Sequence, residues 1–554
     1  MPYTLGLDYG TQSARVLVLD ITTGEELAVE VMPYRHAVMD THFVDGTPLP
    51  PHWALQHPQD YLDVLDTALP AALAKAGVVP EQVIGIGVDF TACTLLPVRA
   101  DATPLALLSE WKNNPYAYVL LWKHHAAQDY ADAINAQAEA QNAPWIKRYG
   151  GLISSEWAFP KMWQVAEEAP EVYAAADYFV EASDWIVWQL MNRETGGHLP
   201  RNACAAGYKG LWHAKEGFPP AAFWSELSPK LDGVLDKLQG SMVQLGSRVG
   251  GLSPHWAQKL GLRPDTAIAA GNVDAHVCVP PAGIGGCGEV LMIMGTSTCH
   301  MLCAEDICEM SGVCGVVEGG ILPGVFGYEA GQACVGDHFN WAAEVCASAD
   351  ILQQAAREGV DVQQVLTARA QKLKPGESGL LALDWWNGNR SVLVDARLSG
   401  LMLGMTLATR PEEIYRALIE ATAFGTRVII EGFEQAGLPV HRVVAAGGIV
   451  EKNPMAMQIY ADVLQRPIHI ATSTQAPARG AAMFGAVAAG EAAGGIADIL
   501  TAAKRLGQQQ PGYQPNAAHK AVYDALYAEY CTLQETFRRG GNDVMKRLMA
   551  MRGL

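Results

Sequence analysis

Residues 6–20 read GLDYGTQSARVLVLD, and this stretch decides the fold that we expect for the chain. Alternating apolar residues lead to a short polar break, and a second apolar run follows it. The pattern predicts two strands joined by a tight turn. A glycine in such a turn lets backbone N–H groups approach an anion, and polar neighbours add donors. The candidate anion-binding residues are Gly10, Thr11, Gln12 and Ser13.

Asp8 lies two residues before this turn, at the end of the first predicted strand. A carboxylate beside a phosphate-sized turn makes chemical sense if a divalent metal ion bridges the two. The residues alone allow a plainer interpretation equally well, in which an ordinary hairpin carries Asp8 on its surface.

Residues 289–305, which read EVLMIMGTSTCHMLCAE, repeat the pattern about half a chain later. A strand-like run again meets a Gly-Thr turn, formed by Gly295, Thr296 and Ser297, and another strand follows. A duplicated hairpin predicts two related domains. Ile293 stands where the first copy has Asp8, so only the first hairpin could hold a metal ion.

The bulk composition bounds the class of protein. A chain of 554 residues, half of them apolar and 18% charged, should form two large domains with sizeable cores. The net charge of −19 argues against a nucleic-acid partner or an anionic membrane surface. No run of eighteen apolar residues occurs, so we expect no membrane span. Eleven cysteines and no recognisable leader indicate a reducing, cytoplasmic location.

Strand-like and helix-like patterns alternate along the chain, so the expected fold class is α/β. Residues 22–60, rich in Pro, His and Asp, predict a loop or an extended excursion over the first domain, and residues 201–212 predict a loop. Thr409 to Glu412 predict a capping box that opens a long helix. Near residue 447, a predicted strand meets a double glycine and then a helix start, which suits a flat or anionic ligand. That segment contains Gly447, Gly448 and Asn453.

Asp274 is the candidate general base. It follows a glycine at the end of the predicted strand in AIAAGNVDAHVCVP, residues 267–280. A strand end presents a side chain to ligand, but a capping or turn role for Asp274 is an equal alternative. Lys209 and Glu329 are further polar residues among glycines and aromatics, which suggests a sugar pocket or, equally, solvated loops.

Several motifs together resemble the FGGY family of carbohydrate kinases, in the actin-like ATPase superfamily, across nearly the whole chain. The motifs are DYGTQSAR, GNVDAH, MGTSTC and AAGGIVEKNPMAMQIYADVL. The runs GVDFTACTLLPV, LLWKHHAAQ, RYGGLISSEWAFPK and WWNGNR are similar to the branch that phosphorylates L-ribulose. Other branches carry Trp-x-Asp-x-Arg where this chain has residues 122–125, WKHH, which counts against glycerol or xylulose as substrate.

The resemblance implies two ribonuclease-H-like domains with a ligand cleft between them. Residues 1–282 would bind sugar and supply the base, residues 289–554 would bind ATP and end in a helical extension, and the pivot would lie at residues 282–288. It implies Asp274 as the base, Asp8 as the magnesium-side carboxylate, and Thr11 with Thr296 as phosphate contacts. Gly447, Gly448 and Asn453 would flank the adenosine, and Ala92, Lys209 and Glu329 would contact sugar hydroxyls.

The activity implied is ATP- and Mg²⁺-dependent phosphorylation of L-ribulose to L-ribulose 5-phosphate, a step of L-arabinose catabolism. One alternative is a kinase of another ketopentose or pentitol, such as D-ribulose, xylulose or ribitol. A second, from another class, is a non-catalytic actin-like ATP switch. The sequence leaves the oligomeric state open, a homodimer included.

Overall fold

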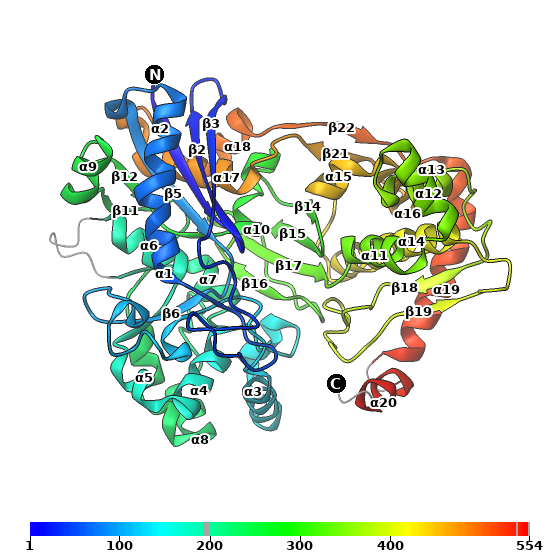
Figure 1. Cartoon of the computed structure of the whole chain (residues 1–554), viewed down its shortest axis with the longest axis horizontal. Coiled ribbons are helices and arrows are strands. Elements are labelled where there is room, and N and C mark those ends of the chain that lie inside the picture. The colour runs from blue at the N-terminus through cyan, green and yellow to red at the C-terminus, as the bar shows by residue number, and fades with distance from the viewer. Residues whose placement is uncertain (192–198, 539–540, 552–554) are drawn as a thin grey trace. The chain divides into compact units, whose positions relative to one another are not determined.

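A computed structural model describes residues 1–191, 199–538 and 541–551 (Figure 1). The chain forms two compact units. Unit 1 comprises Met1–Gly286, Gly315–Gly327 and Ser473–Gln508, and unit 2 comprises Cys287–Cys314, Tyr328–Thr472 and Gln509–Leu554. Residues 473–508 therefore belong to the first unit, although they follow most of the second unit in the sequence.

The main sheet of unit 1 contains the first predicted hairpin, β1 (Tyr3–Tyr9) and β2 (Ser13–Asp20), in antiparallel register. Its order is β11 (Arg248–Gly251), β12 (Ala267–Ala269), β5 (Val83–Phe90), β1, β2, β3 (Glu26–Pro33), with β13 (Asn272–Val273) also paired to β5. Strands β1, β12 and β13 run parallel to β5, so their carboxyl ends share one edge. Residues 22–60, predicted as a loop or an extended excursion, contain the extended strand β3, which is mostly half-buried.

The two faces of this sheet are packed differently. Leu5, Leu7 and Tyr9 of β1 are buried in a core with α1 (Pro58–Asp63) and α2 (Leu69–Ala76). Gly6 points to the other face, where α17 (Ala476–Ala489) lies across β1 and β5 (Figure 1). A Cβ atom at Gly6 would lie 1.7 Å from the backbone oxygen of Ala478, so only glycine allows this approach.

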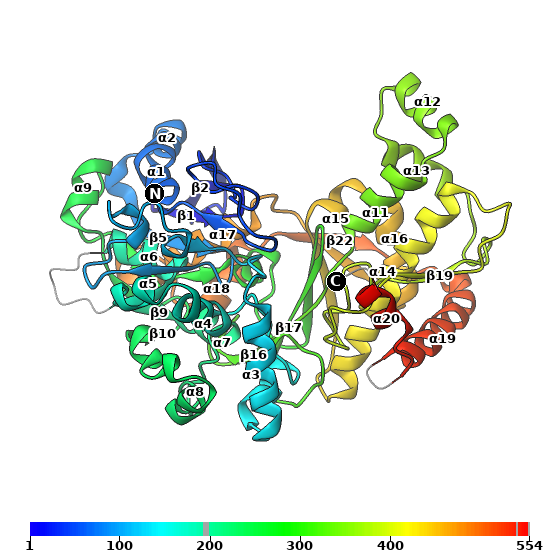
Figure 2. The same cartoon turned by 60° about the horizontal axis from the view of Figure 1, so that its bottom comes forward.

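A second sheet of unit 1 has the order β4 (Leu55–Gln56), β7 (Val119–Leu120), β6 (Leu95–Val98), β8 (Tyr178–Glu181). Figure 2 shows α3 (Gln128–Ala140), α4 (Ala158–Glu168) and α8 (Ala221–Leu227) gathered on one side of this unit. The loop predicted for residues 201–212 is wrong, because Asn202 caps the short helix α7 (Ala203–Tyr208). The other elements of unit 1 are α5 (Pro170–Ala175), α6 (Ala182–Leu190), β9 (Pro200–Asn202), β10 (Ser241–Val243), α9 (Pro254–Leu260), α10 (Asp274–Val277), β16 (Gly315–Glu318) and α18 (Ile499–Leu506).

The sheet of unit 2 contains the second predicted hairpin, β14 (Glu289–Met294) and β15 (Thr298–Ala304), again antiparallel. Its order includes β17 (Phe326–Gln332), β15, β14, β20 (Arg442–Ala446), β21 (Ile468–Ala471) and β22 (Gln509–Tyr513), with β14 parallel to β20. The helices of this unit are α11 (Gly336–Trp341), α12 (Ala349–Glu358), α13 (Val362–Ala370), α14 (Pro411–Gln435), α15 (Gly448–Lys452), α16 (Pro454–Leu464), α19 (Lys520–Phe537) and α20 (Val544–Met551). Strands β18 (Leu381–Leu383) and β19 (Leu401–Leu403) pair separately.

The N-cap of the long helix α14 is Arg410, one residue after the predicted Thr409. Glu413 accepts a hydrogen bond from the backbone N–H of Arg410, whereas Thr409 accepts one from the N–H of Thr406. Gly437 follows the helix in a left-handed conformation, with φ of 88°. Among the described residues, no helix combines the length and the apolar character that crossing a membrane requires.

Candidate active site

Three strands bring polar side chains to the shared carboxyl edge of the unit 1 sheet. Asp8 of β1 is in register with Asp89 of β5, and Asp89 is in register with Asn272 of β13. Side chains paired in register point to the same face of a sheet. Asp274 follows β13 directly and is the first residue of α10. The sheet thus gathers three carboxyl groups at the edge where ligands bind in open α/β sheets.

Asp8 and Asp89 are both buried. Burial raises the pKa of Asp8, and the guanidinium of Arg15, 3.2 Å from its Oδ2, opposes that rise. Burial also raises the pKa of Asp89 well above its usual value, and the negative charges of Asp8 and Asp274 add to the effect. Asp89 shares a side-chain hydrogen bond with Asp8, and its carboxyl oxygens accept none from the usual donors within the described part of the chain.

Sequence patterns assign no role to Asp89. A signal was present in the alternation of β5, where Gly85, Gly87 and Asp89 share one face of the strand. The same spacing occurs in β1 between Gly6 and Asp8. The pairing of these two carboxyl groups depends on the register of strands that are distant in sequence, which the pattern could not supply.

Asp274 is half-buried, and its Oδ1 accepts a hydrogen bond of 2.6 Å from the backbone N–H of Ala275. The ring of His276 on the same short helix lies 4.2 Å from the ring of Tyr208, between centroids. Lys209 directly follows Tyr208 and is buried, with its Nζ 5.5 Å from the centre of the Trp157 ring. The contact between α7 and α10 therefore brings Lys209 and Asp274 into one region of unit 1.

Ala92 is half-buried in the turn between β5 and β6. The hydroxyl groups of Thr91 and Thr94 are 2.7 Å apart and close the turn. The fully buried Lys161 donates hydrogen bonds of 2.7 Å to the backbone oxygens of Cys93 and Leu121. One ammonium group therefore fixes the Ala92 turn and the segment that precedes Trp122.

The first Gly-Thr turn is held from several sides. The N–H of Gly10 donates to the oxygen of Ser13 at 3.0 Å. The indole N–H of Trp122 donates to Oγ1 of Thr11 at 3.0 Å, and Nε2 of Gln56 donates to the backbone oxygen of Thr11 at 2.7 Å. The backbone oxygen of Gln12 accepts from the N–H of Tyr34. The turn is preorganised by residues far away in the sequence.

In unit 2 the second Gly-Thr turn adjoins the double glycine. The N–H of Gly295 donates to the oxygen of Ser297 at 2.9 Å, and the oxygen of Thr296 accepts from the start of α11. Gly447 has φ of 103°, and a Cβ atom there would lie 2.4 Å from the oxygen of Met294, the residue before Gly295. A Cβ atom at Gly448 would meet open space.

Two predicted ligand contacts of unit 2 already have protein partners. Asn453 caps α16 through its Oδ1, which accepts from the N–H of Ala456, while its Nδ2 donates to the hydroxyl of Tyr415 at 3.1 Å. Glu329 is buried and forms an ion pair with Arg390. Their proposed roles toward adenosine and sugar stay predictions.

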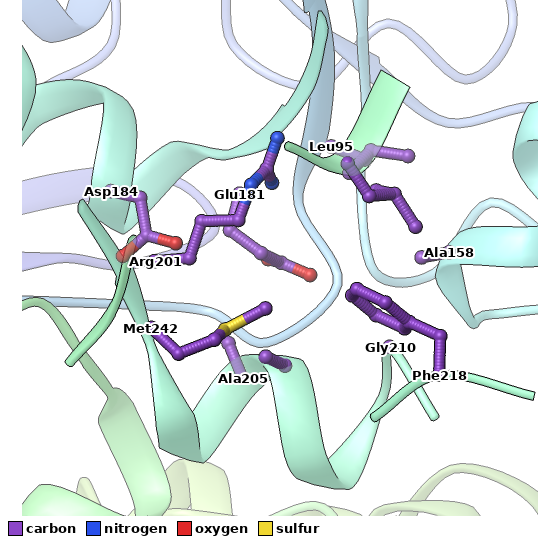
Figure 3. Close-up of a pocket in the computed structure, with 11 residues that line it drawn as sticks. Leu95, Ala158, Glu181, Asp184, Arg201, Ala205, Gly210, Phe218 and Met242 are labelled. Atoms are coloured by element: carbon purple, nitrogen blue, oxygen red, sulfur yellow. The ribbon is translucent and has the colours of Figure 1, made fainter. Parts of the chain in front are cut away.

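A small cavity lies elsewhere in unit 1, beside Glu181, Asp184 and Arg201 (Figure 3). The carboxyl group of Glu181 points into it, and Phe218 closes the opposite side. Burial raises the pKa of Glu181 to about 8 and that of Asp184 to about 6. The volume of about 20 Å³ admits roughly one water molecule, so the cavity is too small for a sugar.

An α/β fold with duplicated Gly-Thr hairpins and a carboxylate cluster at one sheet edge defines a sugar-kinase-like ATPase. Solved structures share this fold: xylulose kinase from Rhodospirillum rubrum has a TM-score of 0.76 at 21% identity, covering 96% of this chain and 98% of that one. A ligand-bound xylulose kinase from Lactobacillus acidophilus has a TM-score of 0.78 at 18% identity, covering 97% and 98%.

The chain belongs to the FGGY family of carbohydrate kinases. Residues 3–279 match the N-terminal domain of that family, and residues 290–489 match the C-terminal domain. A ribulokinase of Halalkalibacterium halodurans is 52% identical over all of this chain and 98% of its own length. A ribulokinase of Anoxybacillus flavithermus is 51% identical over 99% of this chain and 96% of its own length.

Proposed function

We propose that this chain transfers the terminal phosphoryl group of ATP to L-ribulose, giving L-ribulose 5-phosphate and ADP. The observation that carries the proposal is the identity of about half of all residues, over the whole chain, to proteins named ribulokinase. The position of Asp274 at the carboxyl edge of the unit 1 sheet supports it. In this proposal unit 1 supplies the base and most sugar contacts, and unit 2 holds the nucleotide.

Asp274 acts as the general base. Its carboxylate takes the proton of the primary hydroxyl of the sugar as that oxygen bonds to the terminal phosphorus and the bond to the ADP oxygen breaks. The hydrogen bond that the backbone N–H of Ala275 donates to Oδ1 orients the carboxylate. Lys209, Ala92 and Glu329 are the proposed sugar contacts.

The phosphates are proposed to bind the two Gly-Thr turns, through Gly10, Thr11, Gln12 and Ser13 in unit 1 and Gly295, Thr296 and Ser297 in unit 2. Trp122 and Gln56 hold Thr11 in place before any ligand arrives, which lowers the cost of ordering the turn. Gly447, Gly448 and Asn453 are the proposed flank of the adenosine.

A magnesium ion fits beside Asp8. The neighbouring Asp89, a second buried carboxyl group that accepts no hydrogen bond from the usual donors of the described residues, supports a cation here. When bound, Mg²⁺ neutralises charge on the phosphates. Within residues 1–191, 199–538 and 541–551, no group of three His, Cys, Asp or Glu side chains is placed to hold a metal ion by itself. Substrate phosphates and water would supply the other ligands, as is usual for Mg²⁺.

A coupled assay of ADP release tests the proposal. L-ribulose should give the highest kcat/KM in a panel with D-ribulose, xylulose, ribitol and glycerol. A higher value for another ketopentose or a pentitol would transfer the assignment to that sugar. ATP hydrolysis that no sugar of the panel accelerates would instead favour an actin-like switch.

A further inference from the structure

We propose that Asp89 is the second carboxylate of the magnesium site that Asp8 begins, reached directly or through a water of the ion's shell. The inference deepens the proposed function and rests on it for the identity of the ion. It assigns a ligand-binding role to Asp89, for which the sequence pattern indicates none.

Strand register makes the two carboxyl groups neighbours. Asp8 and Asp89 are paired in the parallel ladder of β1 and β5, where strands lie about 4.8 Å apart. Both side chains share the face of Gly6, Gly85 and Gly87, against which α17 packs. Beyond that glycine-lined contact, the sheet edge therefore presents two carboxyl groups side by side.

Local structure does not explain the burial of Asp89. Both of its oxygens are buried and accept no hydrogen bond from the usual donors among the described residues, and its carboxyl group shares a side-chain hydrogen bond with that of Asp8. In the adjoining strand, Nδ2 of Asn272 is likewise buried and lacks an acceptor in the described ranges. Buried polar groups are nearly always satisfied, and a bare buried carboxyl group is costly. The two acidic groups of Asp8 and Asp89, buried side by side with few donors, indicate that a further component completes this edge.

Asp184, a buried carboxyl group of the same unit, differs from Asp89 in its hydrogen bonding. Asp184 is equally buried, but its Oδ1 accepts hydrogen bonds from the backbone N–H and the Nδ2 of Asn202, at 3.0 and 2.8 Å. Asp184 is thus held by the fold itself, and Asp89 is not. A proton shared with Asp8 satisfies Asp89 while no ion is bound, and a cation that replaces this proton would bind both carboxylates. Mg²⁺ suits this role, because it prefers one or two carboxylates with water and phosphate.

The test measures metal binding without sugar or nucleotide. Mn²⁺ serves as a paramagnetic substitute for Mg²⁺ in an electron paramagnetic resonance titration, and thermal unfolding is followed in EDTA and in Mg²⁺. Asp89→Asn should weaken Mn²⁺ binding at least about tenfold and remove most of the Mg²⁺-induced rise in Tm. In EDTA its Tm should equal or exceed that of the wild type, because a buried carboxyl group is gone. Asp8→Asn should behave alike toward the metal.

Asp184→Asn is the matched control, since it should lower Tm in EDTA and keep the metal-induced rise. Asp89→Ser replaces Asp89→Asn if the latter does not fold. Mn²⁺ affinity within about twofold of wild type in the folded variant would overturn the inference, and so would a wild-type protein with no Mg²⁺-induced rise. Metal binding lost in Asp89→Asn, with no turnover of L-ribulose by the wild type, would uphold this inference and refute the proposed substrate.

Discussion

Gly87→Ala should move α17 away from the sheet that carries the carboxyl groups. A Cβ atom at this position would lie 1.9 Å from the backbone oxygen of Ala481, and real Cβ contacts are essentially never shorter than 3.0 Å. The helix must therefore retreat by about 1 Å, because backbone cannot rotate aside. Overpacking of this kind costs about 1–3 kcal/mol, which lowers Tm by a few degrees. Asp89 lies two residues further along the same face, and a misplacement of about 1 Å can cost about 100-fold in rate.

Thermal unfolding and steady-state kinetics measure the two effects separately. The control is Gly250→Ala in β11 of the same sheet, because a Cβ atom there would lie 3.5 Å from the nearest atom, which is ordinary van der Waals contact, so its Tm and kcat should match the wild type. Gly87→Ala with a Tm within about 1 °C of the wild type and an unchanged kcat would refute the reasoning that glycine packing positions this edge.

Three further changes probe the supports of the site. Lys161→Met removes the hydrogen bonds that fix the Ala92 turn, so KM for the sugar should rise about tenfold, with a smaller change in kcat; an unchanged KM would contradict this. Trp122→Phe keeps an aromatic ring but removes the hydrogen-bond donor to Thr11, so KM for ATP should rise about two- to tenfold in the same assay. A change confined to KM for the sugar would contradict a role of Trp122 in holding the phosphate-binding turn. Glu181→Gln tests the buried cavity. The folded protein holds a proton on Glu181 up to a pKa of about 8, whereas the unfolded chain releases it near the ordinary glutamate pKa of 4.5, so rising pH favours unfolding across that window. The variant should exceed the wild type in Tm at pH 8 and lose that advantage near pH 4.5, and equal Tm values at pH 8 would contradict the assignment.

Both hairpins could be read from the sequence, because a Gly-Thr turn between two apolar runs is a local signal. The double glycine before α15 was local in the same way. In contrast, β3 is a mostly half-buried strand in a segment rich in Pro, His and Asp, which favours a loop or extended chain over a defined strand. The helix α7 is too short, at six residues, to give a periodic pattern.

The arrangement of the site could be predicted only in part. Asp8 and Asp274 stand at strand ends that the sequence marks, and the family resemblance supplied their roles. The approach of Asp89 to Asp8 depends on parallel register between β1 and β5, whose pairing no local pattern encodes. The two hydrogen bonds of Lys161 could not be predicted either, because the backbone oxygens that accept them are 40 and 68 residues away in the sequence.

Single-turnover phosphorylation of L-ribulose by Asp274→Asn tests the central claim most directly, with sugar affinity followed by calorimetry in the same samples. Asparagine keeps the size of the side chain and its acceptor for the Ala275 N–H, but it cannot take the proton of the hydroxyl. Loss of a general base typically costs about 10²–10⁴-fold, so the account predicts a rate reduced by that factor with sugar affinity close to that of the wild type. A rate within about threefold of the wild type would contradict it.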